Sequence, residues 1–301
     1  MSELRWHPLL EEWVAFAAHR QVRPIALAGG QSCPFCPGGA EGLNAPYEFV
    51  AFENKFPSFD AGTGGTCEVV LYSDRHNWSL AQASREDIHK LVLVWTDRYR
   101  ELAARRDVKY VYIFENKGAA VGVTLSHPHG QIYAFPFVPP RIKTRIAAEE
   151  RHQRKTGRCL GCELVRRELR GRARLVAANR SFAAYVPSFA RYPYEVHIAA
   201  RRHLGHLGEL RAGESWDLAG ILKTVLVKYD RLYGFSFPYI MLMQQTPSDG
   251  RRHPSHHFLI EFYPPHRSRD KIKYLAGCES GAGTFINDTI PEEKAAELRR
   301  A

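Results

Sequence analysis

The chain has 301 residues, of which 45% are hydrophobic and 25% charged, a globular balance that excludes a disordered chain. Its 42 Lys and Arg against 32 Asp and Glu give a net charge of +10, which favours anionic partners such as phosphorylated small molecules or nucleic acid. Residues 118–140 form the longest uncharged stretch, and its Gly, Pro and His residues exclude a lipid-facing helix. Glu11 and Glu12 interrupt the apolar run that a signal peptide needs, so we expect a cytoplasmic protein.

Strand and helix patterns alternate along the chain. Val69–Tyr72, Val111–Phe114 and Phe258–Tyr263 are rich in β-branched and aromatic residues, which is typical of strands. Residues 84–106 and 214–233 carry apolar residues at helical spacing, and Ser84 with Asp87 three residues later predicts the first helix's N-cap. These elements predict an α+β fold, mostly antiparallel sheet with helices packed on it.

The chain contains an internal repeat. CPFC, ENKFPSF, CEVVLYSDRH, KYVYIFEN and HPHGQIYAFPFVPP in the first half correspond to CLGC, ANRSFAAYVPSF, YEVHIAARRH, FPYIMLMQQ and HPSHHFLIEFYPP in the second. The decads that start at Cys67 and Tyr194 align without gaps. We therefore expect two similar halves, residues 1–145 and 146–301, joined by the arginine-rich segment 141–174, which we interpret as a solvated charged helix or linker.

The pentapeptide His127-Pro128-His129-Gly130-Gln131 carries the strongest chemical signal. On a strand, His127 and His129 point to the same side, and two adjacent imidazoles suggest two different roles, one a metal ligand and the other a nucleophile. A neutral imidazole attacks phosphorus without first losing a proton, and Gln131 could donate a hydrogen bond to a phosphoryl oxygen. The alternative for an isolated His-x-His is a pair of structural histidines.

Two Cys-x-x-Cys pairs suggest metal sites in a reducing compartment, with buried free cysteines or a redox pair as alternatives. Cys33, Cys36, His76 and His127 form a Cys₂His₂ set of the type that binds zinc. A closed shell of four ligands leaves no position open for catalysis.

The repeat predicts a second zinc, because Cys159, Cys162 and His203 stand at the positions of Cys33, Cys36 and His76. The fourth ligand is one of His253, His256 and His257. We favour His257, since a strand HFLIEFY places it on one face with Leu259 and Glu261. Ser255-His256-His257 is expected opposite His129-Gly130-Gln131, which leaves the second half without a nucleophile. The alternative is a relic cysteine pair packed as small hydrophobic residues.

The stretch FENKGAAVGVTLSHPHGQIYAF closely resembles the active-site signature of the galactose-1-phosphate uridylyltransferase family, in the histidine-triad superfamily. His19-Arg20 with Arg23-Pro24, Asn54-Lys55-Phe56 and the FYPP at 262–265 resemble further motifs of this family, so the resemblance spans nearly the whole chain. It implies a duplicated histidine-triad-like unit.

The resemblance implies that His129 is the nucleophile, taking a uridylyl group from UDP-glucose and releasing glucose 1-phosphate. Galactose 1-phosphate, or another hexose 1-phosphate, would then attack the uridylyl-histidine in a double displacement. It also implies nucleotide and phosphate contacts from Arg20, Arg23, Asn54, Asn116, Thr124 and Gln131. Zinc at Cys33, Cys36, His76 and His127 would hold the strand of His129 in place.

Lys273 to Glu279 resembles the family's sugar-phosphate loop, which reaches into the partner subunit's active site. The resemblance implies that Lys273 binds phosphate and Glu279 sugar hydroxyls, in a homodimer with composite active sites. Cys278 and Phe285 depart from the family pattern, which leaves the hexose open, and Asn287 and Asp288 are candidate replacements or turn residues.

An iron-type site of many family members is not expected, because its positions hold Gln244, Leu259 and Glu261. The two Cys-x-x-Cys pairs look more like the branch that includes the plant ADP-glucose phosphorylase. An adenylyl-transferring phosphorylase is therefore the nearest rival, although HPHGQ favours the uridylyl branch. A histidine-triad nucleotide hydrolase fits the chain length and sugar loop less well. A zinc-dependent nucleic-acid-binding protein would leave HPHGQ unexplained, so we expect neither a nucleic-acid nor a membrane partner.

Overall fold

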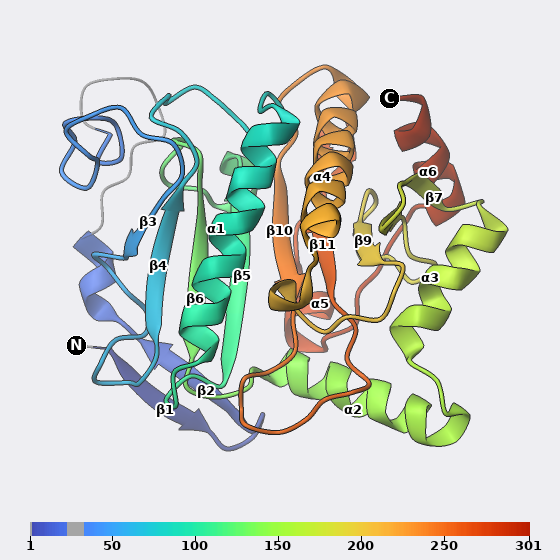
Figure 1. The fold of residues 1–301 in the computed structure, drawn as a ribbon, viewed down its shortest axis with the longest axis horizontal. Helices are drawn as coiled ribbons and strands as arrows, with labels where there is room; N and C mark the ends of the chain where they lie inside the picture. The colour runs from blue at the N-terminus through green and yellow to red at the C-terminus, as the bar shows by residue number, and fades with distance from the viewer. Residues whose placement is uncertain (1, 23–32) are drawn as a thin grey trace.

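The computed structural model describes residues 2–22 and 33–301 and is built on one nine-stranded sheet (Figure 1). Its neighbouring strands pair antiparallel throughout, in the order β3-β4-β6-β5-β10-β11-β9-β8-β7. The strands are β3 (Val50–Glu53), β4 (Thr66–Leu71), β5 (Tyr110–Lys117), β6 (His129–Phe135), β7 (Leu175–Ala178), β8 (Phe182–Tyr185), β9 (Val196–Ala200), β10 (Tyr239–Gln244) and β11 (Leu259–Tyr263). The predicted α+β class with mostly antiparallel sheet is confirmed.

The two repeats meet in the middle of this sheet, where β5 pairs with β10. Outward from this seam, the first half contributes β5, β6, β4 and β3, and the second contributes β10, β11, β9 and β8, with β7 added at its edge. The order of corresponding strands is therefore the same in both halves. This is the duplicated unit that the repeat predicts.

Helices α1 (Arg85–Ala103) and α4 (Ala212–Tyr233) lie side by side on one face of the sheet (Figure 1). They occupy the two predicted helical stretches. The Ser84 hydroxyl accepts the Asp87 N–H at 3.0 Å and the Asp87 carboxylate accepts the Ser84 N–H at 3.2 Å, which confirms the capping pair. Their apolar stripes pack on one side of the neighbouring strands β4, β6, β5, β10, β11 and β9, and this layer is the main core.

The arginine-rich segment forms two helices, α2 (Pro140–Thr156) and α3 (Leu160–Gly171). Arg145 on α2 is not a freely solvated side chain, because its guanidinium pairs with the buried Glu261 of β11. The expectation of a purely solvated segment is wrong at this residue. A buried carboxylate needs a charged partner, and α2 supplies it.

The remaining elements lie around the sheet: hairpins β1 (Glu3–His7) with β2 (Glu12–Phe16) and β12 (His266–Ser268) with β13 (Lys271–Ile272), helices α5 (Gly277–Gly281) and α6 (Pro291–Arg300), and 3₁₀ turns at Ala18–Val22, Ala119–Val121 and Leu207–Glu209. In the described ranges, none of the helices combines the length and hydropathy that a bilayer crossing demands.

The gapless alignment of the two decads does not hold in space. Val69 faces the side of the sheet away from α1 and α4, whereas its aligned partner Val196 packs in the core under these helices. Val69 instead corresponds to His197. Val69 pairs with Gln131 across β4 and β6, and His197 pairs with Glu261, the counterpart of Gln131, across β9 and β11. A shift of one residue moves a side chain to the other face of a sheet, and the chain absorbs the shift before His76 and His203.

Candidate active site

His129 begins β6 and points away from the helix-covered face of the sheet. Its Nδ1–H donates to the main-chain carbonyl oxygen of His127 at 2.8 Å, and this hydrogen bond leaves the lone pair on Nε2. Burial lowers the pKa of His129 below its ordinary value, which favours the neutral imidazole. The site therefore favours an uncharged imidazole and fixes its tautomer, as nucleophilic attack requires.

A pocket opens in front of His129 and collects side chains from six segments of the first half. Gln131 lies two residues along β6, on the same face as His129. Arg20 enters from the N-terminal segment, where its Nη1 donates to the carbonyl of Phe56 at 2.9 Å and to the Ser58 hydroxyl at 2.7 Å. These contacts orient one edge of the guanidinium and direct its charge to the pocket wall.

Asn54 and Thr124 also line the pocket. The side-chain Oδ1 of Asn54 accepts the Phe56 N–H at 2.8 Å, so the side-chain NH₂ group is the part that can serve a ligand. Asn116 is not among the described lining residues, although it lies on the same face of β5 as Phe114, which pairs with Gln131. Arg23 lies outside the described residues. Four of the predicted nucleotide contacts, Arg20, Asn54, Thr124 and Gln131, thus surround His129.

Two lining residues were not singled out from the sequence. Phe35, inside the CPFC motif, lies with its ring 5.2 Å from the ring of His129. Glu41 brings a carboxyl group into the pocket, and burial raises its pKa while Lys55 lowers it. The position of Phe35 between two metal-ligand candidates was an available signal, whereas nothing in the local sequence marks Glu41.

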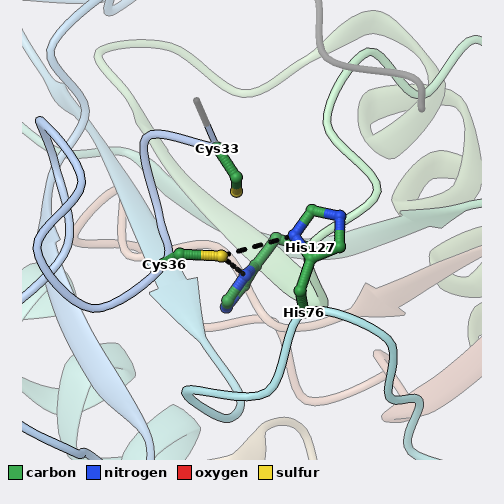
Figure 2. Close-up of side chains that lie close together, drawn as sticks. All are labelled: Cys33, Cys36, His76 and His127. Carbon is green, nitrogen blue, oxygen red and sulfur yellow. Dashed lines mark hydrogen bonds between the residues drawn. The ribbon is translucent and has the colours of Figure 1, made fainter. Parts of the chain in front are cut away.

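The first Cys/His cluster (Figure 2) is connected to this pocket by Phe35, which lines the pocket and stands between Cys33 and Cys36 in the chain. Cys36 Sγ is 3.4 Å from His76 Nδ1 and 3.6 Å from His127 Nδ1, and Cys33 completes the group. The outer ring nitrogens are also satisfied, because His127 Nε2–H donates to the Ser73 carbonyl at 2.7 Å and His76 Nε2 lies 3.0 Å from the Ser126 hydroxyl. Second-shell bonds of this kind orient imidazole ligands.

The donor set and its spacing fit a tetrahedral zinc ion. Zinc–sulfur and zinc–nitrogen bonds of about 2.3 and 2.0 Å place ligand atoms roughly 3.6 Å apart. The four ligand atoms lie within 4.8 Å of one another, and two thiolates with two imidazoles favour zinc over magnesium or calcium. The predicted ligand set is thus assembled by the fold in a geometry that matches the metal.

The second half assembles a matching cluster from Cys159, Cys162, His203 and His257. Cys162 Sγ is 3.4 Å from His257 Nδ1 and 3.8 Å from His203 Nδ1. His257 Nε2–H donates to the Ala200 carbonyl at 2.9 Å, as His127 does to Ser73. The favoured fourth member, His257, is the one that the structure brings to the cluster.

The other two candidates are engaged elsewhere. His253 Nε2 pairs with Asp249 at 3.0 Å, and the fully buried His256 pairs through Nδ1 with Glu149 at 2.8 Å. Neither ring belongs to the described cluster of four.

The expected counterpart of His129-Gly130-Gln131 is corrected by the structure. Because His257 corresponds to His127, the counterparts lie four residues beyond Ser255-His256-His257, at Leu259-Ile260-Glu261. A cavity of about 150 Å³ remains at this place, beside His257 and Leu259. An aliphatic side chain replaces the nucleophile there, so this cavity lacks the chemistry of the first.

Glu261 is held by a buried network of its own. Its carboxylate pairs with Arg145, accepts from Gln244 Nε2 at 3.1 Å and lies 3.9 Å from His197 Nε2. Burial alone would raise the pKa of Glu261, but Arg145 and His197 lower it to about 2. This carboxylate therefore serves the attachment of α2 to the sheet.

The two predicted sugar-phosphate residues lie away from His129 within the chain. Lys273 Nζ donates to Glu279 Oε1 at 2.8 Å, both side chains are buried, and neither lines the His129 pocket as the structure describes it. This hydrogen bond lowers the pKa of Glu279 to about 2. Asn287 donates to the Ala190 carbonyl at 2.9 Å and its Oδ1 accepts the Thr289 N–H at 3.1 Å, a local turn contact, whereas Asp288 pairs with Arg267 at 2.9 Å.

Comparisons with known proteins place the chain in a family. The N-terminal domain of galactose-1-phosphate uridyl transferase matches residues 53–139, and the C-terminal domain matches residues 145–301. The galactose-1-phosphate uridylyltransferase of Thermotoga maritima is 43% identical over 99% of this chain and 98% of its own length, and that of Haemophilus influenzae is 33% identical over 98% and 93%.

Solved structures agree with these matches. A uridylyltransferase structure is 33% identical with a TM-score of 0.90, covering all of this chain and 98% of its own. An ADP-glucose phosphorylase from Arabidopsis thaliana with bound ADP-glucose is 25% identical with a TM-score of 0.79, covering 100% and 99%. The chain that holds His129, its pocket and the Cys/His cluster therefore belongs to the galactose-1-phosphate uridyl transferase family.

Proposed function

We propose that this protein transfers a uridylyl group from UDP-glucose to galactose 1-phosphate or another hexose 1-phosphate, through a covalent intermediate on His129. The observation that carries the proposal is the neutral, oriented imidazole of His129 at a pocket lined by Arg20, Asn54, Thr124 and Gln131. The 43% identity to the Thermotoga maritima enzyme over nearly the full length of both chains supports the same reaction.

In the first step, His129 Nε2 donates its lone pair to the α-phosphorus of UDP-glucose, and the bond from that phosphorus to the oxygen of glucose 1-phosphate breaks. The departing phosphate keeps the electron pair. Nδ1 keeps its proton, held by the His127 carbonyl, so the reaction needs no separate base. Gln131 and Arg20 are placed to stabilise negative charge on the phosphoryl oxygens.

In the second step, a phosphate oxygen of the hexose 1-phosphate attacks the same phosphorus and the nitrogen–phosphorus bond breaks. The imidazole returns to its neutral form, and no net proton is gained or lost. The first step exchanges a phosphoanhydride P–O bond for a P–N bond and the second reverses this exchange, so the same residues serve in each direction.

Two structural zinc ions complete the proposal, one held by Cys33, Cys36, His76 and His127 and one by Cys159, Cys162, His203 and His257. When bound, such an ion cross-links a Cys-x-x-Cys loop to a strand of the sheet. In the first half, the cross-linked residue is His127, whose carbonyl fixes the His129 tautomer. His127 therefore contributes to the metal site with its side chain and to the active site with its main chain.

We further propose a homodimer in which Lys273 and Glu279 of each subunit complete the site of the other. Within one chain these residues are paired with each other rather than with the His129 pocket. A contribution from the second copy is consistent with this separation.

The test uses UDP-glucose labelled on the uridylyl phosphate. Incubation with the purified protein should release glucose 1-phosphate and leave label on His129, found by peptide mapping, and galactose 1-phosphate should then remove the label as UDP-galactose. Release without retained label, with water as the acceptor, would support a hydrolase and contradict the proposal.

A second candidate is an adenylyl-transferring phosphorylase, which the similarity to the Arabidopsis structure supports. It would use the same His129 with ADP-glucose as donor and inorganic phosphate as acceptor. A panel that crosses UDP-glucose and ADP-glucose with hexose 1-phosphates and phosphate separates the two functions by kcat/KM.

A further inference from the structure

Tyr72 contacts the chain immediately before and immediately after His129. Tyr72, which directly follows β4, donates its main-chain N–H to the Pro128 carbonyl at 3.2 Å, just before His129. Its hydroxyl lies under Gly130, just after His129: a Cβ added at Gly130 would meet Tyr72 Oη at 2.2 Å and Cζ at 3.0 Å. One residue thus touches the chain on both sides of His129.

Tyr72 cannot swing away from this position. Its side chain is fully buried, and its ring meets Trp95 edge to face at 6.3 Å. Its hydroxyl donates to Glu115 Oε2 at 3.4 Å, while Tyr239 donates to Glu115 Oε1 at 3.2 Å. Glu115 is itself buried on β5, next to Phe114, the pairing partner of Gln131.

We propose that Tyr72, held by Glu115, is a positioning residue that sets the height of Gly130 above the core and thereby the reach of His129 and Gln131 into the pocket. His129 and Gln131 flank Gly130 and point to the opposite face, so any rise of Gly130 displaces both side chains together. Glycine is required here because the Tyr72 hydroxyl fills the space where a side chain would begin.

This proposal rests on the proposed function, since the rate it concerns is that of attack by His129. The substitution that tests it most directly is Gly130→Ala, whose methyl group collides with the Tyr72 hydroxyl. We expect uridylyl-enzyme formation to slow by about 100-fold, the cost of a displacement of roughly 1 Å at a reacting group, with the Kd for UDP-glucose little changed.

The decisive experiment adds Tyr72→Phe to Gly130→Ala. Removing the hydroxyl relieves the 2.2 Å contact and leaves only the milder 3.0 Å contact with Cζ, so the double variant should form the adduct at least about tenfold faster than Gly130→Ala. The matched control adds Tyr239→Phe instead, which removes the other phenol from Glu115 and leaves the collision in place. A double variant no faster than Gly130→Ala, or equal rescue by Tyr239→Phe, would overturn the proposal.

Should Gly130→Ala fail to fold, the single variants decide. Tyr72→Phe should slow adduct formation more than Tyr239→Phe, at unchanged zinc content, and equal effects would contradict the positioning role. A wild-type protein that forms no adduct would defeat the proposed function alone. In that case, urea unfolding of wild type, Gly130→Ala, Tyr72→Phe and the double variant tests the contact. Additive effects of the two substitutions on the unfolding free energy would show that Gly130 and Tyr72 are not coupled, and would overturn the proposal.

Discussion

The main chain of His127 and the side chain of His129 are joined by a 2.8 Å hydrogen bond from Nδ1–H to the carbonyl oxygen. The His127 side chain points to the cluster instead, with its Nδ1 3.6 Å from Cys36 Sγ. The tautomer of the proposed nucleophile is therefore set by a neighbour that belongs to the Cys/His cluster. This arrangement separates the effects of substituting the two histidines.

His129→Ala should abolish uridylyl transfer in both half-reactions and leave zinc content and thermal stability close to wild type. The reason is that the His129 side chain bonds the main-chain carbonyl of His127 and is not a member of the described Cys/His cluster. Label retention from UDP-glucose, elemental analysis and thermal unfolding measure the three properties. Label remaining on the His129→Ala protein would refute the assignment of the nucleophile.

His127→Ala should behave in the opposite order, losing about one zinc ion per chain together with stability, because metal-binding free energy contributes to folding. Activity should fall as a consequence of the displaced carbonyl. The measurement is zinc per chain alongside the thermal midpoint. Full zinc content in this variant would contradict the proposed ligand set.

Cys159→Ser should reduce zinc from two ions per chain to one and lower thermal stability, with only an indirect loss of activity. The second cluster neighbours Leu259 rather than a nucleophile, so its metal has no reacting group to orient. Cys278→Ser is the matched control, since Cys278 lies outside both clusters and should leave the count at two. A single zinc in the fully loaded wild-type protein would exclude the second site.

Mixing inactive His129→Ala with inactive Lys273→Ala subunits should restore activity, because a mixed dimer contains one site with both residues intact. With random exchange, about one quarter of the wild-type activity is expected. The assay follows UDP-galactose formation after subunit exchange, with each variant alone as control. Mixtures that stay inactive, or a fully active monomer in sedimentation, would argue against sites shared between subunits.

Arg145→Met should lower the free energy of unfolding by up to about 3–5 kcal/mol, the range for breaking a buried ion pair. Glu261 loses its nearest cation in this variant and keeps Arg191 at 3.8 Å and His197 at 3.9 Å while remaining buried. Urea unfolding at neutral pH gives the value. Arg267→Met, which removes the exposed pair with Asp288, is the control and should cost about 0–1 kcal/mol.

Acid should remove the same stabilisation from the wild-type protein. The pKa of Glu261 is lowered from 4.5 to about 2 in the fold, so its contribution is complete above about pH 4.5 and is lost as pH falls toward 2. Over this interval the difference in unfolding free energy between wild type and Glu261→Gln should shrink. A difference that stays constant with pH would show that the carboxylate is not charged in the folded protein.

The sequence predicts the two long helices and the membership of both clusters because each depends on local spacing or on matching segments. Ser84 and Asp87, three residues apart, cap the first long helix. His257 begins the stretch HFLIEFY, which is typical of a strand. The relation between the halves is harder to predict. His253-Pro254 looks like His127-Pro128, yet the position of His127 in the cluster is taken by His257, four residues further along the chain.

Contacts between distant segments were invisible in the sequence for a different reason. Arg145 and Glu261 are separated by 116 residues, and neither lies in a motif that indicates the other. Tyr72 likewise follows a strand of ordinary composition, and only the pairing of β4 with β6 brings its ring beneath Gly130. Such pairs depend on strand register, which turns and loops decide outside the motifs.

The pairing of β5 with β10 means that the duplicated halves are not separable modules. β5, which carries Glu115 and Asn116, pairs at the centre of the sheet with residues 239–242 of β10 from the second half. A chain cut between residues 139 and 145 would leave each half with a long, apolar, unpaired strand edge, the kind of edge that recruits other chains. Expressed alone, either half should aggregate, and the two should regain solubility only when they fold together in the same cell.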